Sequence, residues 1–567
     1  MATGGQKRTR WERVAALELP PGSWKRAWAS LHRHDVWLRI GLCVLTALVL
    51  CMVIRGWHPP FIYRKDYVFS RDMVARVPFE VPDAKGTHAA AGHGVVRREA
   101  GETLAEAGKP LREEQVWALR AEHEAWIAQR PWSQRFFRAL AVMAIILTLF
   151  ALCALYLHNR QRRLLVNLPG LALMSALAVA TVGLSRWAAM YPWRAEIIPL
   201  LLFGQTVAIA YRRELALLFT GVVTAILVLG LGHGFGHGLG PFLILMGVAA
   251  AAILQLGRIR NRSKLVHVAA FAALAAFLLT IVVSLLDSQL VGAPLLQAAG
   301  LVALWTFLAG FLMAGLLFFI ERLFGVLTDI SLLELGDASH PLLQELVRRA
   351  AGTYNHSIIV GSIAEAAADA IGAWGLLVRV GAYFHDIGKT LKPIYFIENQ
   401  PPDDNRHEGL VPAMSTLVIV AHVKDGADLA RQHRLPDAIV NLIQQHHGTT
   451  LVEYFYGRAN EQRRSDPNGN AVEESTFRYP GPRPQTREAG VLMLADAAEG
   501  ACRALFDPAP ARIESAVHEV AEKRLQGGQF DESGLTLPEL RTVEQSVIKS
   551  LIANYHGRIK YPDQRTA

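Results

Sequence analysis

Ten of the 20 histidines of the chain lie after residue 330, and one of them stands directly before an aspartate, as His385-Asp386. The pair follows the apolar segment 376–384, where neither side chain is stable without a partner. Neutral imidazole and carboxylate groups are suitable ligands for Zn, Mn or Fe, and the two oxygens of a carboxylate can bridge two ions. The pair therefore indicates a metal site.

Five further residues of the same region have side chains that bind metals. They are His356, His422, the pair His446-His447, and Asp496. Each alone has a simpler interpretation, because a lone histidine is most often an ordinary core or surface residue and a histidine before glycine can end a helix. Only together, as an ordered series along the chain, do these residues indicate a metal site.

The elements that must position these residues are predicted to be helices. Apolar residues recur at helical spacing in segments 357–367 and 376–384, and strand-like alternation is scarce between 340 and 450. The polar stretch 458–475 is predicted to be a mobile insertion without chemistry. We therefore expect an all-α domain in the last part of the chain.

The composition excludes a purely soluble enzyme. Of the 567 residues, 52% are hydrophobic and 19% are charged, and the mean hydropathy is +0.23. Four cysteines are too few for a disulfide scaffold. The formal net charge of +9 could indicate nucleic-acid binding, but in a membrane protein the same excess usually marks cytoplasmic loops.

Eight segments are long and apolar enough to cross a bilayer, one before and seven after a polar region of about 80 residues. They lie near 36–55, 138–158, 165–184, 192–210, 214–233, 239–257, 265–286 and 296–320. The fourth is the weakest, since Arg194 and Glu196 leave about 14 clean apolar residues. Basic clusters precede the first span and follow the second, fourth and sixth, which places both chain ends in the cytoplasm.

This topology predicts five parts in a multi-pass protein of the inner (plasma) membrane. They are a basic cytoplasmic tail (1–35), an anchor (36–55), an extracytoplasmic region of α+β or α structure (56–136), a seven-helix membrane domain (137–322) and a cytoplasmic domain (323–567) with a core at about 340–505. Within the extracytoplasmic region, a helix is predicted from Glu113 to Gln129. Topology thus explains the positive charge, and no nucleic acid polymer is expected as a partner.

The ordered series His356, His385-Asp386 and Asp496 resembles the H…HD…D signature of the HD superfamily of metal-dependent phosphohydrolases. Longer stretches, including VGAYFHDIGKTLKPIYFIENQ, IVNLIQQHHGTTLVEYFY and FRYPGPRPQTREAGVLMLADAAEGACRAL, resemble the seven-transmembrane HD family of the PgpH type. That family is described as one anchor, an extracytoplasmic region, seven spans and a C-terminal HD domain. The resemblance implies a phosphodiesterase that hydrolyses cyclic di-AMP to linear pApA.

The resemblance also implies a two-metal site. Asp386 would bridge the ions, with His356, His385 and Asp496 on one and His422, His446 and His447 on the other. Mn or Fe suits such nitrogen and oxygen ligands, and Zn remains compatible. Two ions can lower the pKa of a shared water, so that an activated hydroxide attacks phosphorus.

Three further residues are expected to contact the substrate. Lys389 would neutralise a phosphate oxygen, although it could instead cap a helix. Arg478 and Tyr479 would contact a second phosphate or stack on adenine, although their segment could simply be a rigid loop.

Alternative functions remain at this stage. One is an HD phosphohydrolase for another nucleotide; the cyclic di-GMP class is disfavoured because Gly448-Thr449-Thr450 follows the histidine pair and no Gly-Tyr-Pro triplet does. Another is a membrane receptor that only senses a nucleotide. The expected partners are the lipid bilayer, a cyclic dinucleotide and an unidentified extracytoplasmic ligand, and the two-fold symmetry of the nucleotide is compatible with a homodimer without requiring one.

Overall fold

The computed structural model describes residues 34–69, 71–82, 95–190, 193–231, 239–287, 292–401, 405–465, 472–506 and 508–556. The predicted basic tail therefore lies outside the described residues, apart from its last two positions. The chain divides into two compact units. One comprises residues 1–257 and 262–326, and the other comprises 258–261 and 327–567.

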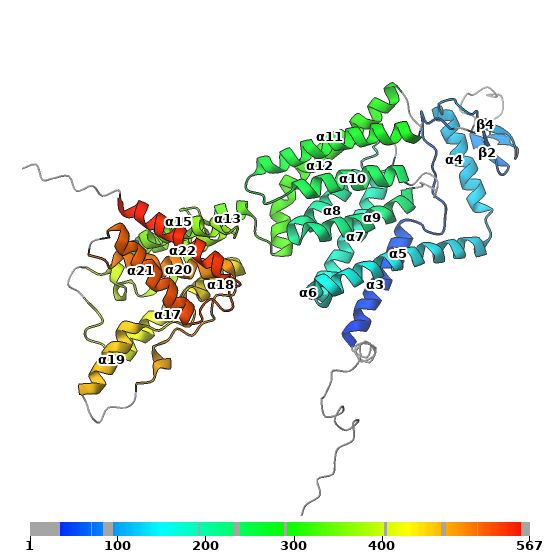
Figure 1. The fold of residues 1–567 in the computed structure, drawn as a ribbon. Coiled ribbons are helices and arrows are strands. Elements are labelled where there is room, and N and C mark those ends of the chain that lie inside the picture. The colour runs from blue at the N-terminus through cyan, green and yellow to red at the C-terminus, as the bar shows by residue number, and fades with distance from the viewer. Residues whose placement is uncertain are drawn as a thin grey trace, which may run out of the picture. The chain divides into compact units, whose positions relative to one another are not determined.

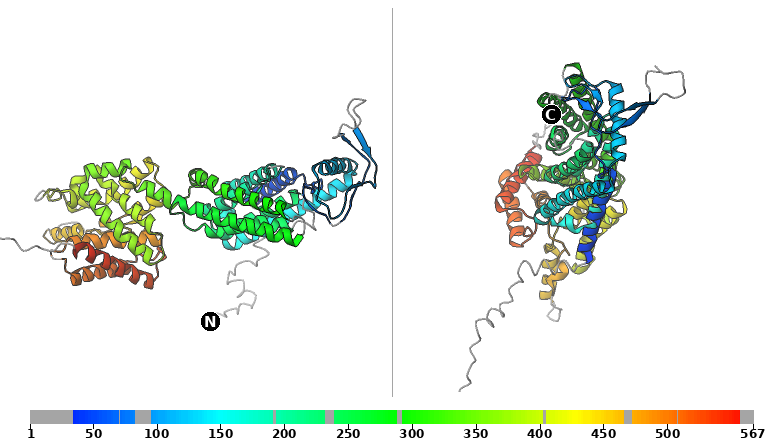
Figure 2. Two further views of the ribbon diagram at one scale, coloured as in Figure 1. Left: turned by 90° about the horizontal axis from the view of Figure 1, so that it is seen from above. Right: turned by 90° about the vertical axis from the view of Figure 1, so that its right-hand side faces the viewer.

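The first unit is a bundle of apolar helices (Figures 1 and 2). Its helices are α3 (His34–Val53), α5 (Trp132–Arg160), α6 (Arg162–Val166), α7 (Leu168–Ala188), α8 (Ile197–Ala210), α9 (Arg213–Leu231), α10 (Leu239–Gln255), α11 (Arg262–Asp287) and α12 (Ala293–Phe324). An apolar helix lies at each of the eight predicted spans. Six of them are long and apolar enough to cross a membrane, whereas α8 and α10 are apolar but shorter.

The short helix α8 lies inside the bundle, and this position explains why a helix of only 14 residues is sufficient there. Leu200, Phe203, Gln205 and Val207 are all buried, and α8 packs against α7, α9, α10 and α12. A helix surrounded by other helices need not present a full-length apolar face to lipid.

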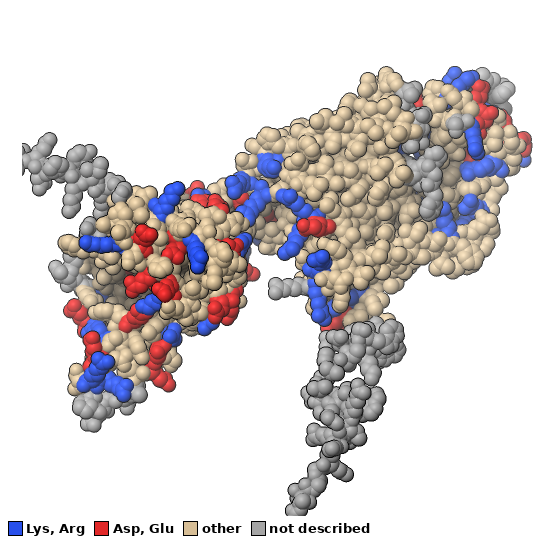
Figure 3. All heavy atoms as spheres, viewed as in Figure 1, with Lys and Arg blue, Asp and Glu red and all other residues tan. Residues whose placement is uncertain are grey.

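The outer helices of this unit instead expose large apolar side chains. Leu285 and Phe319 are 58% and 63% exposed. The face seen in Figure 3 is largely free of charged side chains between its ends. Hydroxyls within the helices donate to the carbonyl four residues earlier, as Thr181 and Thr306 do. These features suit a surface solvated by lipid, where no water satisfies polar groups.

The polar region between α3 and α5 is a small α+β structure. Strands β1 (Met73–Val74) and β4 (Thr103–Ala105) pair antiparallel, as do β2 (Phe79–Pro82) and β3 (Val95–Arg98). Helix α4 (Glu113–Ala128) ends one residue before the predicted boundary. A buried carboxylate, Glu122, accepts three hydrogen bonds from Arg76 and ties α4 to the segment after β1.

The second unit is all-α, as predicted. Its helices are α13 (Asp329–Leu335), α14 (Pro341–Arg349), α15 (Ala351–Ala370), α16 (Gly375–Phe384), α17 (Pro412–Gln432), α18 (Asp437–Gln445), α19 (Glu453–Ser465), α20 (Arg487–Arg503), α21 (Pro510–Gln526) and α22 (Leu537–His556), with 3-10 turns η1 (Ile387–Leu391), η2 (Pro393–Tyr395), η3 (Ile397–Asn399) and η4 (Glu474–Phe477). Helix α20 runs through the core, where residues 489–496 are all buried.

One sequence expectation is wrong. The polar stretch 458–475 was predicted to be a mobile insertion, but α19 continues through its first part to Ser465. The residues there, mostly Arg, Ala, Glu and Gln, are good helix formers, and this propensity outweighs the lack of an apolar face.

Candidate metal centre

Five helices of the second unit bring the seven predicted ligands together. His356 lies on α15, His385 and Asp386 follow the end of α16, His422 lies on α17, His446 and His447 follow the end of α18, and Asp496 lies on α20. Six of the seven are buried, and His447 is partly exposed. Residues 140 positions apart in the sequence therefore share one buried site.

The first group of possible ligands consists of His356, His385 and Asp496. Asp496 Oδ1 lies 2.9 Å from His356 Nε2 and 3.5 Å from His385 Nε2. Ligand atoms that share one ion at about 2.0–2.2 Å are separated by roughly 3 Å. The spacing of this group fits a single metal ion.

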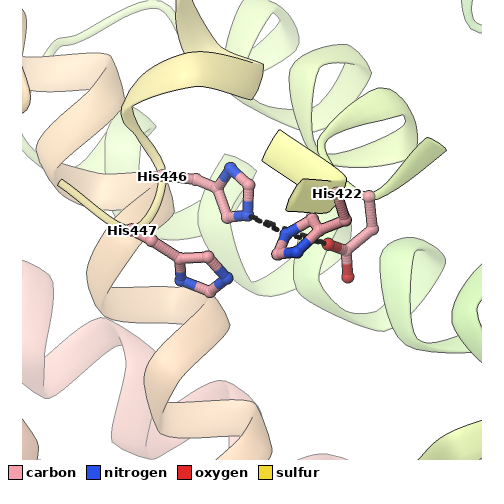
Figure 4. Close-up of side chains that lie close together, drawn as sticks. His422, His446 and His447 are labelled. Carbon is pink, nitrogen blue, oxygen red and sulfur yellow. Dashed lines mark hydrogen bonds and ion pairs between the residues drawn. The ribbon is translucent and has the colours of Figure 1, made fainter. Parts of the chain in front are cut away.

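The second group consists of Asp386, His422, His446 and His447. Figure 4 shows the three imidazoles turned toward one another. The Nε2 atoms of His422 and His446 are 3.3 Å apart, and His422 Nε2 lies 3.2 Å from Asp386 Oδ1. Two imidazole nitrogens facing each other at this distance and beside a carboxylate are the arrangement that a shared cation would stabilise.

Asp386 lies between the two groups. Its Oδ1 faces His422 and, at 3.7 Å, His446 Nε2. Its Oδ2 lies 3.2 Å from His385 Nε2 and 3.8 Å from His356 Nε2. One oxygen thus points to each group, which is the geometry required of a bridging carboxylate.

Backbone carbonyls orient three of the imidazoles. The Nδ1 atoms of His385, His422 and His446 lie 2.6, 2.5 and 2.7 Å from the carbonyl oxygens of Ala382, Ile419 and Ile443. Each Nδ1–H therefore donates to the chain three residues earlier. This contact fixes the orientation of each ring and directs its Nε2 toward the cluster, where the deprotonated atom can bind a metal.

The charges of the site shift its pKa values in opposite directions. Burial raises the pKa of Asp386, but His385, Lys389 and His422 together outweigh burial and hold that pKa well below its usual range. Burial lowers the pKa of His385, yet Asp386 and Asp496 raise it to about 10. Burial, together with His385, lowers the pKa of His446 to about 3. The carboxylates are therefore ionised and His446 is neutral, which are their metal-binding forms, whereas His385 would release a proton on binding a metal.

The residues fit a metal centre by a further criterion. His385 Nε2 and Asp386 Oδ1 are buried and have no hydrogen-bond partner among the residues that the structure describes. Buried polar atoms without partners are costly, and these two face the middle of the cluster. A cation there would satisfy both.

Lys389 lies at the site, but its ammonium already has two partners. Its Nζ lies 2.7 Å from Asp386 Oδ2 and 2.8 Å from Glu398 Oε1, and Glu398 in turn accepts a hydrogen bond from Thr353. Burial lowers the pKa of Lys389, but the two carboxylates outweigh it and raise that pKa above its ordinary value. Lys389 is thus a permanent cation beside Asp386 and does not cap a helix.

The two predicted substrate residues that follow η4 differ in position. Tyr479 lies over His447, with ring centroids 4.3 Å apart, so its aromatic face borders the site. Arg478 is exposed, forms an ion pair with Glu474 and donates to the Thr449 carbonyl at 2.9 Å. The structure brings Tyr479 to the cluster, whereas the Arg478 guanidinium is engaged elsewhere.

Sequence reasoning missed a pair of residues behind His356. Glu499 Oε2 lies 2.5 Å from His356 Nδ1 and accepts a hydrogen bond from Arg503 at 2.5 Å. Glu499 is 3% exposed, and its pKa, which burial raises, is lowered by His356 and Arg503. The available signal was the spacing of Asp496 and Glu499, which are three residues apart in a domain predicted to be all-α.

The fold and the cluster define a class: a polytopic helical membrane protein with an HD-type metal site. A family model described as a 7TM receptor with intracellular HD hydrolase matches residues 136–328, and an HD domain model matches residues 353–501, which include all seven clustered residues. The chain belongs to this family of seven-transmembrane proteins with an HD hydrolase domain. HD hydrolases depend on divalent metals, and the His/Asp cluster could bind them.

Two curated relatives carry the name cyclic-di-AMP phosphodiesterase PgpH. The protein of Bacillus subtilis is 40% identical over 328 residues, which cover 57% of this chain and 45% of that protein. The protein of Listeria monocytogenes is 38% identical over 329 residues, covering 57% and 44%. The matched region thus spans less than half the length of these relatives.

Two solved structures are also similar. They are crystal structures of the HD domain of the L. monocytogenes phosphodiesterase PgpH, one of them in complex with cyclic di-AMP. Both are 42% identical to this chain with a TM-score of 0.36, and they cover 38% and 39% of it and all of the solved chain.

Proposed function

We propose that this protein is a membrane-bound, metal-dependent phosphodiesterase that hydrolyses cyclic di-AMP to linear pApA and so regulates the level of a second messenger. The observation that carries the proposal is the pairing of two ligand groups by Asp386 in a chain 40% identical to a named cyclic-di-AMP phosphodiesterase. Water adds to one phosphorus, and the 3′ oxygen of one ribose leaves with a proton.

The proposed roles follow the geometry. One ion would be held by His356, His385 and Asp496, and the other by His422, His446 and His447. Asp386 would bind both ions. Bound divalent ions supply Lewis acidity, which activates water and neutralises charge on the phosphodiester. Mn or Fe is the proposed metal, and Zn remains compatible, because the ligands are only nitrogen and oxygen.

The residues of the chain itself position the reactants. Lys389 keeps Asp386 ionised and oriented through its ion pair and adds a positive charge near the reacting phosphate. Tyr479 offers an aromatic face beside His447, suited to stacking on an adenine base. Arg478 would reach a phosphate only after leaving Glu474.

The proposed location is the inner (plasma) membrane, with the chain N-terminus and the HD domain in the cytoplasm. Support comes from the basic clusters at residues 160–163, 212–213 and 258–262, which all fall on one side if eight helices cross the bilayer. The small α+β region would then face the extracytoplasmic side.

The direct test uses the full-length protein purified in detergent and supplied with Mn or Fe. Cyclic di-AMP and cyclic di-GMP are incubated separately, and the products are identified by chromatography against pApA. We expect pApA and a higher kcat/KM for cyclic di-AMP. No turnover of cyclic di-AMP with any divalent metal would sink the proposal, and a preference for cyclic di-GMP would correct the substrate.

A further inference from the structure

Arg524 is a cation without a partner at the edge of the metal centre. It lies in the last turn of α21, and its Nε is buried with no hydrogen-bond partner. Among the residues that the structure describes, no carboxylate lies within ion-pair distance of it. Arg503 differs, because its guanidinium pairs with Glu499. The Arg524 side chain is half-buried, and its guanidinium is free to bind an anion.

Two contacts hold the end of α21 beside the metal ligands. The Gln529 side chain accepts a hydrogen bond from the Thr449 backbone N–H at 3.0 Å and donates to Thr449 Oγ1 at 3.0 Å, two residues beyond His447. Lys523, the neighbour of Arg524, forms an ion pair with Glu453 of α19. The last turn of α21 is therefore fixed against the segment that carries the histidine pair.

The electrostatics agree with this placement. Burial lowers the pKa of the Arg524 guanidinium, and the charges of Asp496 and Glu453 only partly oppose this effect. Tyr479 also interacts electrostatically with Arg524. The charges of Arg524 and Asp496 thus interact, although the two side chains form no ion pair.

We propose that Arg524 binds the phosphate of the cyclic dinucleotide that is not being hydrolysed. The inference rests on the proposed function, in which the metal ligands and Lys389 surround the reacting phosphate. A cyclic dinucleotide carries a second phosphate with one negative charge, and Arg524 offers a planar donor set that binds such an oxyanion in two contacts. The phosphate would supply the counter-charge that the folded chain does not.

The test compares Arg524→Gln with Arg541→Gln, a control that removes an arginine charge from an exposed position on α22. Full-length proteins loaded with Mn are assayed with cyclic di-AMP and with bis(p-nitrophenyl) phosphate, a diester that has one phosphate. We expect Arg524→Gln to raise KM for cyclic di-AMP by roughly 10- to 100-fold, the loss of a charge-assisted contact. Turnover of the small diester and metal content should stay at parent values, and Arg524→Lys should recover part of the affinity.

Other outcomes separate the two proposals. An unchanged KM for cyclic di-AMP in Arg524→Gln overturns the role of Arg524 and leaves the function standing. Equal losses on both substrates, or a loss of metal, would show that Arg524 only supports the fold or the ions. If the parent cleaves the small diester but not cyclic di-AMP, the proposed function fails first and the second-phosphate site fails with it.

Discussion

Asp386 is the residue on which the two ligand groups depend, because it offers one oxygen to each. We predict that Asp386→Ala releases both ions and lowers kcat by at least about 100-fold. This loss exceeds the roughly 10- to 100-fold effect of removing a residue that only hydrogen-bonds to a metal ligand. Metal content by elemental analysis and pApA formation would be measured on the same sample.

Asp428→Ala is the matched control, since Asp428 lies exposed on α17 and pairs only with Arg431 in the described chain. The control should keep both metal and activity. Turnover that survived in Asp386→Ala while metal was lost would contradict a catalytic metal centre.

Glu499 acts through His356 and is a positioning residue. Its carboxylate lies against Nδ1 of that imidazole and so fixes the orientation of the ring, in which Nε2 faces Asp496. We predict that Glu499→Gln lowers metal affinity about 10- to 100-fold, the usual cost of losing a carboxylate behind a metal-binding histidine. A metal titration followed by activity would measure it.

The control for this variant is Glu514→Gln on α21, where the side chain is exposed. Excess metal should restore much of the activity of Glu499→Gln, which a general loss of folding would not allow. An unchanged metal affinity would show that Glu499 has no positioning role.

At the scale of elements, close packing of η1 on α17 brings Asp386 to His422. A Cβ atom at Gly388 would lie 2.0 Å from the His422 carbonyl oxygen and 2.6 Å from the Gly426 nitrogen. No side chain fits between two backbones at this separation, so glycine is required there by approach rather than by its backbone angles.

We predict that Gly388→Ala separates η1 from α17, destabilises the domain by about 1–3 kcal/mol or more and weakens metal binding. Thermal unfolding with and without metal would measure both effects. Gly457→Ala on α19 is the control, since its Cβ would meet nothing within 4 Å, and alanine in an exposed helix should leave stability unchanged or slightly higher. Equal unfolding temperatures for the two variants would contradict the packing argument.

The helices themselves were largely predictable, because each depends on local apolar periodicity. The boundaries of α4 and α16 fall within one residue of those expected. The last part of α19, residues 458–465, was not predicted, because it has a helical composition without an apolar stripe. Local pattern thus finds helices that bury a face and misses those that do not.

At the scale of the whole molecule, the eight apolar helices predict an orientation. We expect a membrane-impermeant maleimide to label Glu124→Cys, in the exposed part of α4, on intact cells. Glu461→Cys, exposed on α19, should be labelled only after the membrane is opened. The parent protein gives the background, because Cys51, Cys153 and Cys502 are buried and Cys43 is partly buried. Labelling of Glu461→Cys on intact cells would contradict the predicted orientation and place the HD domain outside the cytoplasm.

The sequence by itself determined the family and the helical, membrane-spanning nature of the chain, and it identified seven candidate ligands. These properties depend on local composition, spacing and ordered motifs, which do not require knowledge of distant contacts.

Only the tertiary structure decided which atoms face one another. It paired Lys389 with Asp386 and Glu398, directed Arg478 to Glu474, and set Glu499 behind His356. It also left Arg524 unpartnered beside the site. These contacts join residues from separate helices, and the side-chain directions that produce them follow from packing of the whole domain rather than from any local pattern.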